Sequence, residues 1–274
     1  MSSSMSVFRK AYLFTFIRGL RVWTTYKSQA IFTVLGWLLP VFLYYFIATY
    51  LGRSAVQSLD PSGTTYISFF VIGLAFQGYV SALVASLSQR IRTEEEMGTL
   101  EHVMLSPTGP AAILAYTTLW PLLLNSVQAG VVLLIGIYLF GVRLHVNLAA
   151  TALILVLTLA SNAGIGMMAA AYTLFAKQGN PISLFFSTFS VFISGVVFPV
   201  TVLPFALRIV SYAIPLTWGL VGLRLAMLNA AALPALLPYV EYLGIACAIS
   251  LPLGFLLFRA AFNFVRRQGT LSGY

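Results

Sequence analysis

Charged residues are scarce in this sequence. Only 8% of its 274 residues are Asp, Glu, Lys or Arg, whereas 60% are hydrophobic. An ordinary soluble domain has roughly 25% charged residues, so the composition excludes that class. Cysteine is scarcer still, because Cys247 is the single one, and one thiol builds neither a disulfide framework nor a cysteine metal site.

The residues that several enzyme and carrier classes require are also missing. Lysine occurs only at positions 10, 27 and 177, never after a glycine, so the sequence has no Gly-Lys-Ser/Thr loop for nucleotide phosphates. His102 and His145 stand far apart and in no metal-ligand spacing, and we predict no metal site. A proton-driven carrier usually needs ionisable groups inside the bilayer, and the long apolar runs have none near mid-depth. We therefore predict that this chain is not an enzyme and takes its energy from elsewhere.

Long apolar runs dominate the chain instead. A helix needs about 20 apolar residues to cross a hydrocarbon core of roughly 30 Å. On that requirement we predict an all-α integral membrane protein, a single domain over residues 1–274, with roughly six transmembrane helices. The predicted spans cover about residues 30–51, 66–88, 111–140, 148–175, 181–198 and 239–265.

Basic residues flank these runs unequally. With six spans, eleven of the 15 lysines and arginines fall on the side that holds both chain ends. The positive-inside rule then places both termini in the cytoplasm. Residues 199–238 would lie on the outer side, where Pro199, Pro204 and Pro215 break the segment into short helices. We predict a re-entrant hairpin there, which enters the bilayer and returns.

Residues 6–28 combine basic and aromatic side chains. At helical spacing Lys10, Arg18 and Arg21 share one narrow sector, with aromatic side chains largely opposite. The pattern predicts an amphipathic interface helix on the cytoplasmic membrane surface, with its basic sector toward anionic headgroups. A basic anchor that only flanks the first span would have a similar pattern.

One acidic stretch interrupts this basic chain, at residues 93–107, TEEEMGTLEHVMLSP. Thr93 followed by Glu96 fits a capping box, in which the first side chain caps a new helix. The pattern predicts a short helix over about residues 94–105, in the cytoplasmic loop between the second and third spans.

An apolar stripe accompanies these acids. Met97, Leu100 and Met104 fall on one face at helical spacing. Anionic lipids would repel the acidic residues, so a protein partner explains the stripe better than the membrane surface does. A solvated loop helix is the alternative.

At this point the sequence resembles the type-2 permeases of ATP-binding-cassette (ABC) exporters. Their loop after the second span has a pattern like E-x-x-x-G-T-L-E-x-L-x-x-S/T-P, and here Val103 stands at its later apolar position. The matching residues are Glu94, Gly98, Thr99, Leu100, Glu101, Met104, Ser106 and Pro107. A later family pattern, G-x-x-F-P-x-x-x-L-P with P-L-T and L-R, is matched by Gly195, Phe198, Pro199, Leu203, Pro204, Pro215, Leu216, Thr217, Leu223 and Arg224.

The resemblance implies a role for the acidic loop and for the N-terminal helix. In that family the loop is a coupling helix, which docks into a groove on a separate ATPase subunit. The implied coupling residues are Glu94, Met97, Gly98, Thr99, Leu100, Glu101 and Met104. The family's interface helix corresponds to the segment with Lys10, Arg18 and Arg21.

The resemblance also implies a function. The chain would be the permease subunit of an ATP-driven exporter in the plasma (inner) membrane. It would pair with a second copy of itself and with two copies of an ABC ATPase, which would hold ATP and Mg²⁺, so that this chain needs no cofactor. A lipophilic small molecule or drug is the first candidate cargo, and a lipid, glycolipid or polysaccharide is the second. A hydrophobic peptide stays open as a third cargo. From a different function class, a channel or a membrane-embedded enzyme that acts on lipids also stays open. We predict no binding of nucleic acid.

Aromatic and amide side chains within the spans predict a path for an amphiphile. The candidate path residues are Trp37, Tyr44, Phe76, Gln77, Tyr79 and Phe192. Core packing and interfacial aromatic belts place the same residue types in membrane helices, so both interpretations stand.

Overall fold

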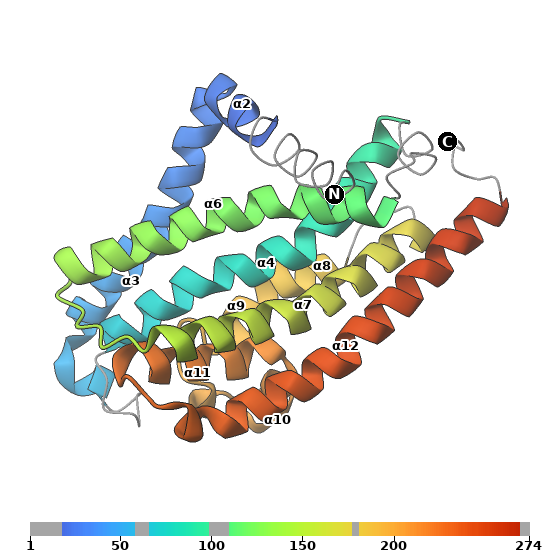
Figure 1. The fold of residues 1–274 in the computed structure, drawn as a ribbon. Helices are drawn as coiled ribbons and strands as arrows, with labels where there is room; N and C mark the ends of the chain where they lie inside the picture. Colours follow the sequence, from blue (N-terminus) through green and yellow to red (C-terminus); the bar gives the residue numbers. More distant parts are fainter. Residues whose placement is uncertain (1–17, 58–65, 99–109, 177–180, 269–274) are drawn as a thin grey trace, which may run out of the picture.

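The computed structural model describes residues 18–57, 66–98, 110–176 and 181–268, and these are helical with short connections (Figure 1). The short helix α2 Arg18–Thr25 comes first. The long helices are α3 Lys27–Gln57, α4 Tyr66–Glu96, α6 Pro110–Tyr138, α7 Leu148–Ala176 and α12 Leu233–Gln268. The other short helices are α8 Pro181–Leu184, the π-helix η2 Phe185–Phe189, α9 Ser190–Ile193, the 3₁₀ helix η3 Val200–Val202, α10 Phe205–Ala213 and α11 Pro215–Leu228.

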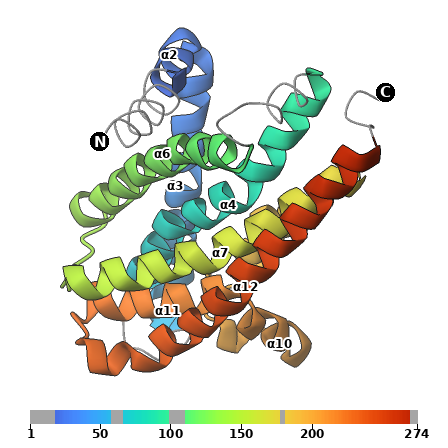
Figure 2. The same ribbon diagram turned by 45° about the vertical axis from the view of Figure 1, so that its right-hand side comes forward.

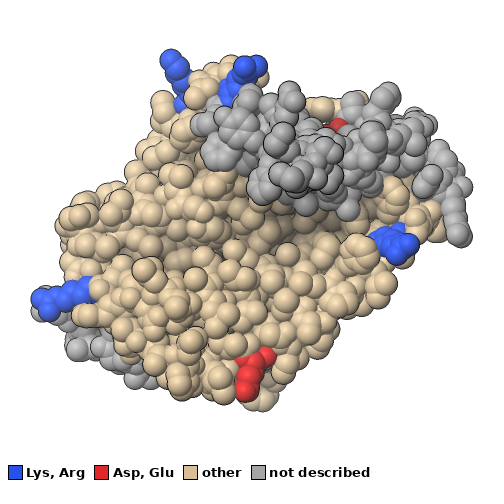
Figure 3. Space-filling view, viewed as in Figure 1, with Lys and Arg blue, Asp and Glu red and all other residues tan. Residues whose placement is uncertain are grey.

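Five of the described helices are long and apolar enough to cross a membrane, and a sixth span results if the bent pair α10–α11 counts as one. The five are α3, α4, α6, α7 and α12, which correspond to five of the predicted spans. On the face drawn in Figure 3, the charged side chains of described residues lie toward the edges, and a broad uncharged zone separates them. The predicted class, an all-α integral membrane protein, is therefore confirmed.

The long helices form a bundle in which α4 is the most buried span and α3 the most exposed. Helix α4 packs against α6 and α7, and α7 packs along α12 (Figures 1 and 2). The C-terminal ends of α4 and α12 lie at the same end of the bundle, which we call the α4 end. The opposite end, called the hairpin end, holds α10, α11 and the connection from α6 to α7.

Small residues allow the closest helix contact, between α7 and α12. A Cβ added to Gly254 would lie against the backbone of Gly164, and one added to Gly164 would lie against Ser250. The Ser250 hydroxyl also donates a hydrogen bond of 2.8 Å to the Ser161 carbonyl across the same contact. Without a hydrophobic driving force between helices in lipid, such close backbone packing and interhelical bonding hold them together.

The predicted fifth span is wrong as a full-length helix. Of the predicted residues 181–198, only 181–193 are helical, in the run α8–η2–α9, which spans about 20 Å at ~1.5 Å per residue. The helix cannot continue because Gly195 has φ +75°, a left-handed conformation that favours glycine. Residues 194–199 then turn back into the protein, where most of them are buried.

The segment after this turn differs in part from the predicted hairpin. Helices α10 and α11 are bent by 81° at Ile214, which precedes Pro215, and this sharp bend fits either a broken span or a re-entrant hairpin. Residues 233–238, which the sequence placed in the hairpin, instead begin α12. The hairpin is tied to the bundle because His145 and Asn147 donate backbone hydrogen bonds to the last turn of α11.

Candidate functional site

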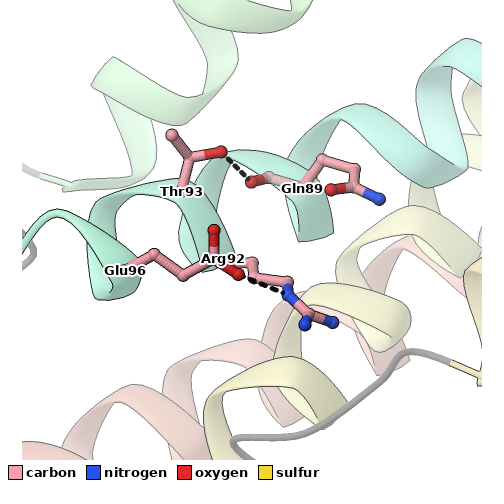
Figure 4. Close-up of polar contacts among 4 residues, drawn as sticks. All are labelled: Gln89, Arg92, Thr93 and Glu96. Atoms are coloured by element: carbon pink, nitrogen blue, oxygen red, sulfur yellow. Dashed lines mark hydrogen bonds and ion pairs between the residues drawn. The ribbon is translucent and has the colours of Figure 1, made fainter.

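The acidic stretch begins inside α4, so the predicted N-cap at Thr93 is wrong. Helix α4 runs without a break to Glu96, and the Thr93 hydroxyl donates 2.8 Å to the Gln89 carbonyl one turn back (Figure 4). A capping residue would instead accept a bond from an N–H ahead of it. The acids therefore lie on the last turns of the second span, continuous with it, and do not start a separate helix.

Two ion pairs explain why the helix continues through this stretch. Arg92 Nε lies 2.8 Å from Glu96 Oε1 (Figure 4). Arg90 pairs with Glu94 at the same four-residue spacing. This spacing brings opposite charges together only if the backbone is helical. Glu94 is buried, whereas Glu96 is exposed. The pairs offset the unfavourable placement of carboxylates at the negative end of a helix dipole.

The helix ends immediately after these pairs. Gly98 has φ +66°, and its N–H donates 3.0 Å to the Glu95 carbonyl, so a left-handed glycine closes the last turn. Met97 is 69% exposed at this end, an apolar side chain that no described residue covers. Of the other predicted coupling residues, Thr99, Leu100, Glu101 and Met104 lie outside the described residues.

The predicted interface helix is described only over its second half. Helix α2 covers Arg18–Thr25, Arg21 is exposed, and Lys10 lies outside the described residues. Tyr26 separates α2 from α3, and in both views α2 turns away from the axis of α3 (Figures 1 and 2). The orientation of this helix on a membrane surface stays a prediction.

The predicted path residues are spread over the core and the outside of the bundle. Phe76 and Tyr79 are buried in the core, where their rings stack at 6.1 Å and the Tyr79 hydroxyl bonds Ser126 at 2.9 Å. Gln77 bonds Ser81 within the same helix at 2.8 Å, and Phe192 is 51% exposed on α9. Trp37 and Tyr44 are half-buried on α3. Core packing accounts for the buried members of this set.

The hairpin end contains a residue whose role the sequence did not reveal. Arg224, in the segment that the sequence places on the outer side, is only 8% exposed. Its Nη2 donates to the carbonyls of Gly195 at 2.8 Å and Val196 at 3.2 Å, and its Nε donates to Phe69 at 3.1 Å. The guanidinium carbon lies 3.4 Å from the centre of the Phe69 ring. Arg224 thus ties α11 to the start of α4 and to the turn after α9.

An aromatic cluster braces the hairpin beside this arginine. Trp218 Nε1 and the Tyr242 hydroxyl both donate 2.8 Å to the Tyr212 carbonyl. The Trp218 ring lies 4.8 Å from Tyr242 and 6.1 Å from Tyr239, measured between ring centres. These contacts join α10, α11 and α12, so the bend between α10 and α11 is held from both sides.

Comparison with known protein families matches residues 11–228 to the family described as ABC-2 type transporter. The chain belongs to this family. The matched range covers most of the 274 residues and includes the acidic end of α4, the turn at Gly195 and Arg224. A search of curated proteins finds no match.

Membership of the ABC-2 family gives the chain a general role. The ABC-2 chain is the membrane-embedded permease component of an ABC transporter, and such permeases generally work with an ABC ATPase. The membrane character that composition predicted is thus confirmed at the level of the family. The acidic end of α4 and the braced hairpin are the two parts of the described structure in which charged groups are built into the fold.

Proposed function

We propose that this chain is the permease subunit of an ATP-driven exporter of lipophilic small molecules in the plasma membrane, with both termini in the cytoplasm. Two copies pair with two copies of a separate ABC ATPase, which binds ATP and Mg²⁺. The cargo leaves toward the outside or the outer leaflet. Family membership supports the permease role, and the continuity of α4 supports the way in which the ATPase acts on it.

The continuity of α4 is the observation that carries this mechanism. The helix has 31 residues, about 46 Å at ~1.5 Å per residue, which exceeds a hydrocarbon core of roughly 30 Å. Its excess length is the charged end from Arg90 to Glu96. Because no break separates this end from the span, a push on the end displaces the whole helix as one body.

The surface at the end of α4 fits a protein partner. Met97 is exposed beside the carboxylate of Glu96, so an apolar contact and an acidic group lie together outside the span. Burial of Met97 in a groove of the ATPase would supply apolar contact, and the acids would select a basic rim. The remaining coupling residues, Thr99 to Met104, follow directly in the sequence.

Replacement of Met97 by Asp tests this docking. The variant should co-purify less ATPase and lose ATP-driven transport of a lipophilic dye in inside-out vesicles, because a charge would enter an apolar contact. Its fold should not change, since the side chain is 69% exposed. The matched control is Tyr138→Asp. Tyr138 is the last residue of α6, its side chain is 79% exposed, and this terminus of α6 lies at the hairpin end.

The partner is identified by mass spectrometry as an ATPase with a nucleotide-binding loop, purified with the tagged full chain. If Met97→Asp retains both the ATPase and dye transport at the level of Tyr138→Asp, the docking proposal is wrong. If the ATPase binds but no dye is moved, while lipid or glycolipid stimulates ATP hydrolysis, the second cargo class replaces the first. If no ATPase binds under any condition, the exporter proposal fails.

A further inference from the structure

A cavity of about 370 Å³ lies at the hairpin end, within one copy of the chain. Its walls come from the start of α4, the turn after α9, η3, the end of α10, α11 and the start of α12. Ligand sites have volumes of about 300–1,000 Å³ and mostly apolar walls with a few placed polar groups. The residues that carry the argument are Phe69, Ser194, Tyr212, Trp218, Arg224 and Tyr239.

Ser194 brings an unsatisfied hydroxyl to this cavity. Its side chain is 1% exposed, and its Oγ has no hydrogen-bond partner among the residues that the structure covers. Burial of a hydroxyl without a partner is unfavourable, and native structures contain few such groups. An oxygen acceptor on a molecule inside the cavity would complete the hydrogen bonding of this group.

Arg224 places a positive charge in the same wall. Its guanidinium is held by the carbonyls of Gly195 and Val196, the two residues that follow Ser194. No Asp or Glu is among the described residues that line the cavity. In apolar surroundings a fixed charge acts more strongly than in water, so the wall favours an anionic or electron-rich headgroup over a cation.

The remaining wall is aromatic and rigid. Trp218 is fixed by its bond of 2.8 Å to the Tyr212 carbonyl and by ring contact with Tyr239 at 6.1 Å. Phe69 is fixed under the Arg224 guanidinium. Rigid aromatic side chains provide a large contact area at little cost in conformational entropy, which suits the apolar body of a ligand.

We propose that this cavity binds an amphiphile whose apolar body lies against Trp218 and Tyr239 and whose anionic oxygen headgroup accepts a hydrogen bond from Ser194. Arg224 supplies the favourable electrostatic potential. Binding is a property of this chain alone, so the proposal stands or fails separately from ATP-driven export. A membrane lipid and a soluble amphiphile such as a fatty acid present the same headgroup chemistry.

Tryptophan fluorescence tests the proposal, because bromine quenches an indole that it touches. Trp23, Trp37 and Trp120 are replaced by Phe, which leaves Trp218 as the reporter, and the purified full chain in nanodiscs is titrated with 12-bromododecanoate without ATPase. We expect saturable quenching that dodecanoate reverses and that 12-bromododecanol reproduces only weakly. A chain with Trp120 as its sole tryptophan reports non-specific partition into the lipid.

Two variants locate the site. Ser194→Ala should weaken binding about tenfold, the effect of one lost hydrogen bond to a charged group, without loss of thermal stability. Val221→Phe should abolish saturable binding because Val221 lines the cavity and the larger ring fills it. Val156→Phe on α7, where the side chain is 60% exposed, is the matched control and should bind like the parent chain.

Different results would overturn the proposal or identify the source of the ligand. Quenching that rises linearly and equally in all variants, or equal affinity of the Ser194→Ala chain, overturns the proposal. If the chain with one tryptophan does not fold, a diazirine-tagged dodecanoate is cross-linked to the unaltered chain, and labelled peptides outside the cavity walls refute the site. An anionic phospholipid that co-purifies and is displaced by bromododecanoate identifies the membrane as the source, whereas saturable binding without such a lipid identifies a soluble amphiphile.

Discussion

Replacement of Arg224 by Met should destabilise the permease more than any change of an exposed arginine. Methionine keeps an unbranched apolar side chain but donates no hydrogen bond. The Phe69 carbonyl lies within α4, where a helical N–H also bonds it. The carbonyls of Gly195 and Val196 lie in the turn after α9 and would lose the donor that holds them there.

The magnitude follows from these two carbonyls. A buried polar group that loses its partner costs about 1–3 kcal/mol, so the two together cost about 2–6 kcal/mol. Loss of the contact between the guanidinium and the Phe69 ring adds to this cost, whereas relief from burying the charge subtracts from it. We expect a net loss of about 3 kcal/mol, which corresponds to a decrease in Tm of about 6–12 °C for a chain of this size.

The assay is thermal unfolding of the tagged full chain in one detergent at one scan rate, since membrane proteins often unfold irreversibly. Arg224→Lys should lose about half as much as Arg224→Met, because one ammonium keeps the charge but not the fixed fork of donors. Arg259→Met, at an exposed position on α12, is the matched control and should change Tm by less than about 1 °C. A Tm of the Arg224→Met chain within that same margin would refute the bridging role.

Two further predictions concern packing and topology. Gly78→Leu should lower Tm by several degrees, because a Cβ added to Gly78 meets Asn125 and Gln128 of α6. The control Gly36→Leu on α3 should leave Tm unchanged, since nothing lies within 4 Å of a Cβ added there. Equal Tm values for the two variants would contradict the tight α4–α6 contact. In a chain without Cys247, a cysteine in place of Arg143 should react with an impermeant thiol reagent from outside, and one at Glu96 only after permeabilisation. The reverse pattern would invert the proposed orientation.

Much of the bundle was predictable because bilayer thickness fixes the length of an apolar helix. The predicted range 148–175 differs from α7 by one residue, and 111–140 differs from α6 by at most two. These signals are local and periodic, and the bilayer leaves them few alternatives.

The ends of the helices were harder to predict, because a capping pattern and the spacing of charged residues can favour opposite outcomes at the same position. Thr93 and Glu96 fit a capping box, but the pairs Arg90–Glu94 and Arg92–Glu96 outweigh it by favouring continuous helix. The four-residue spacing of these charges was visible in the sequence and would have indicated the continuation. At residues 181–198 the composition was apolar enough for a span, and Gly195 alone carried the signal that the helix ends early.

The cavity could not be predicted from the sequence, because its walls come from six segments between residues 69 and 239. Nothing local distinguishes Arg224 from an exposed loop arginine; only the fold brings it to carbonyls some 30 and 155 residues away. Long-range pairing of this kind is what secondary-structure periodicity does not encode. The predicted path residues were chosen by residue type, and residue type alone does not distinguish the buried Phe76 and Tyr79 from the exposed Phe192.

Helix α4 connects the two ends of the molecule. Measurement of Tm should therefore distinguish a substitution at one end of α4 from a substitution at the other. Phe69 lies near its start and Met97 just past its end, and no break in the helix separates them. Movement of α4 by a partner at Met97 would therefore shift the Phe69 ring and carbonyl against Arg224, at the wall of the cavity. It follows that Met97→Asp should impair transport at unchanged Tm, whereas Arg224→Met should lower both, since only the second change removes contacts within the folded chain.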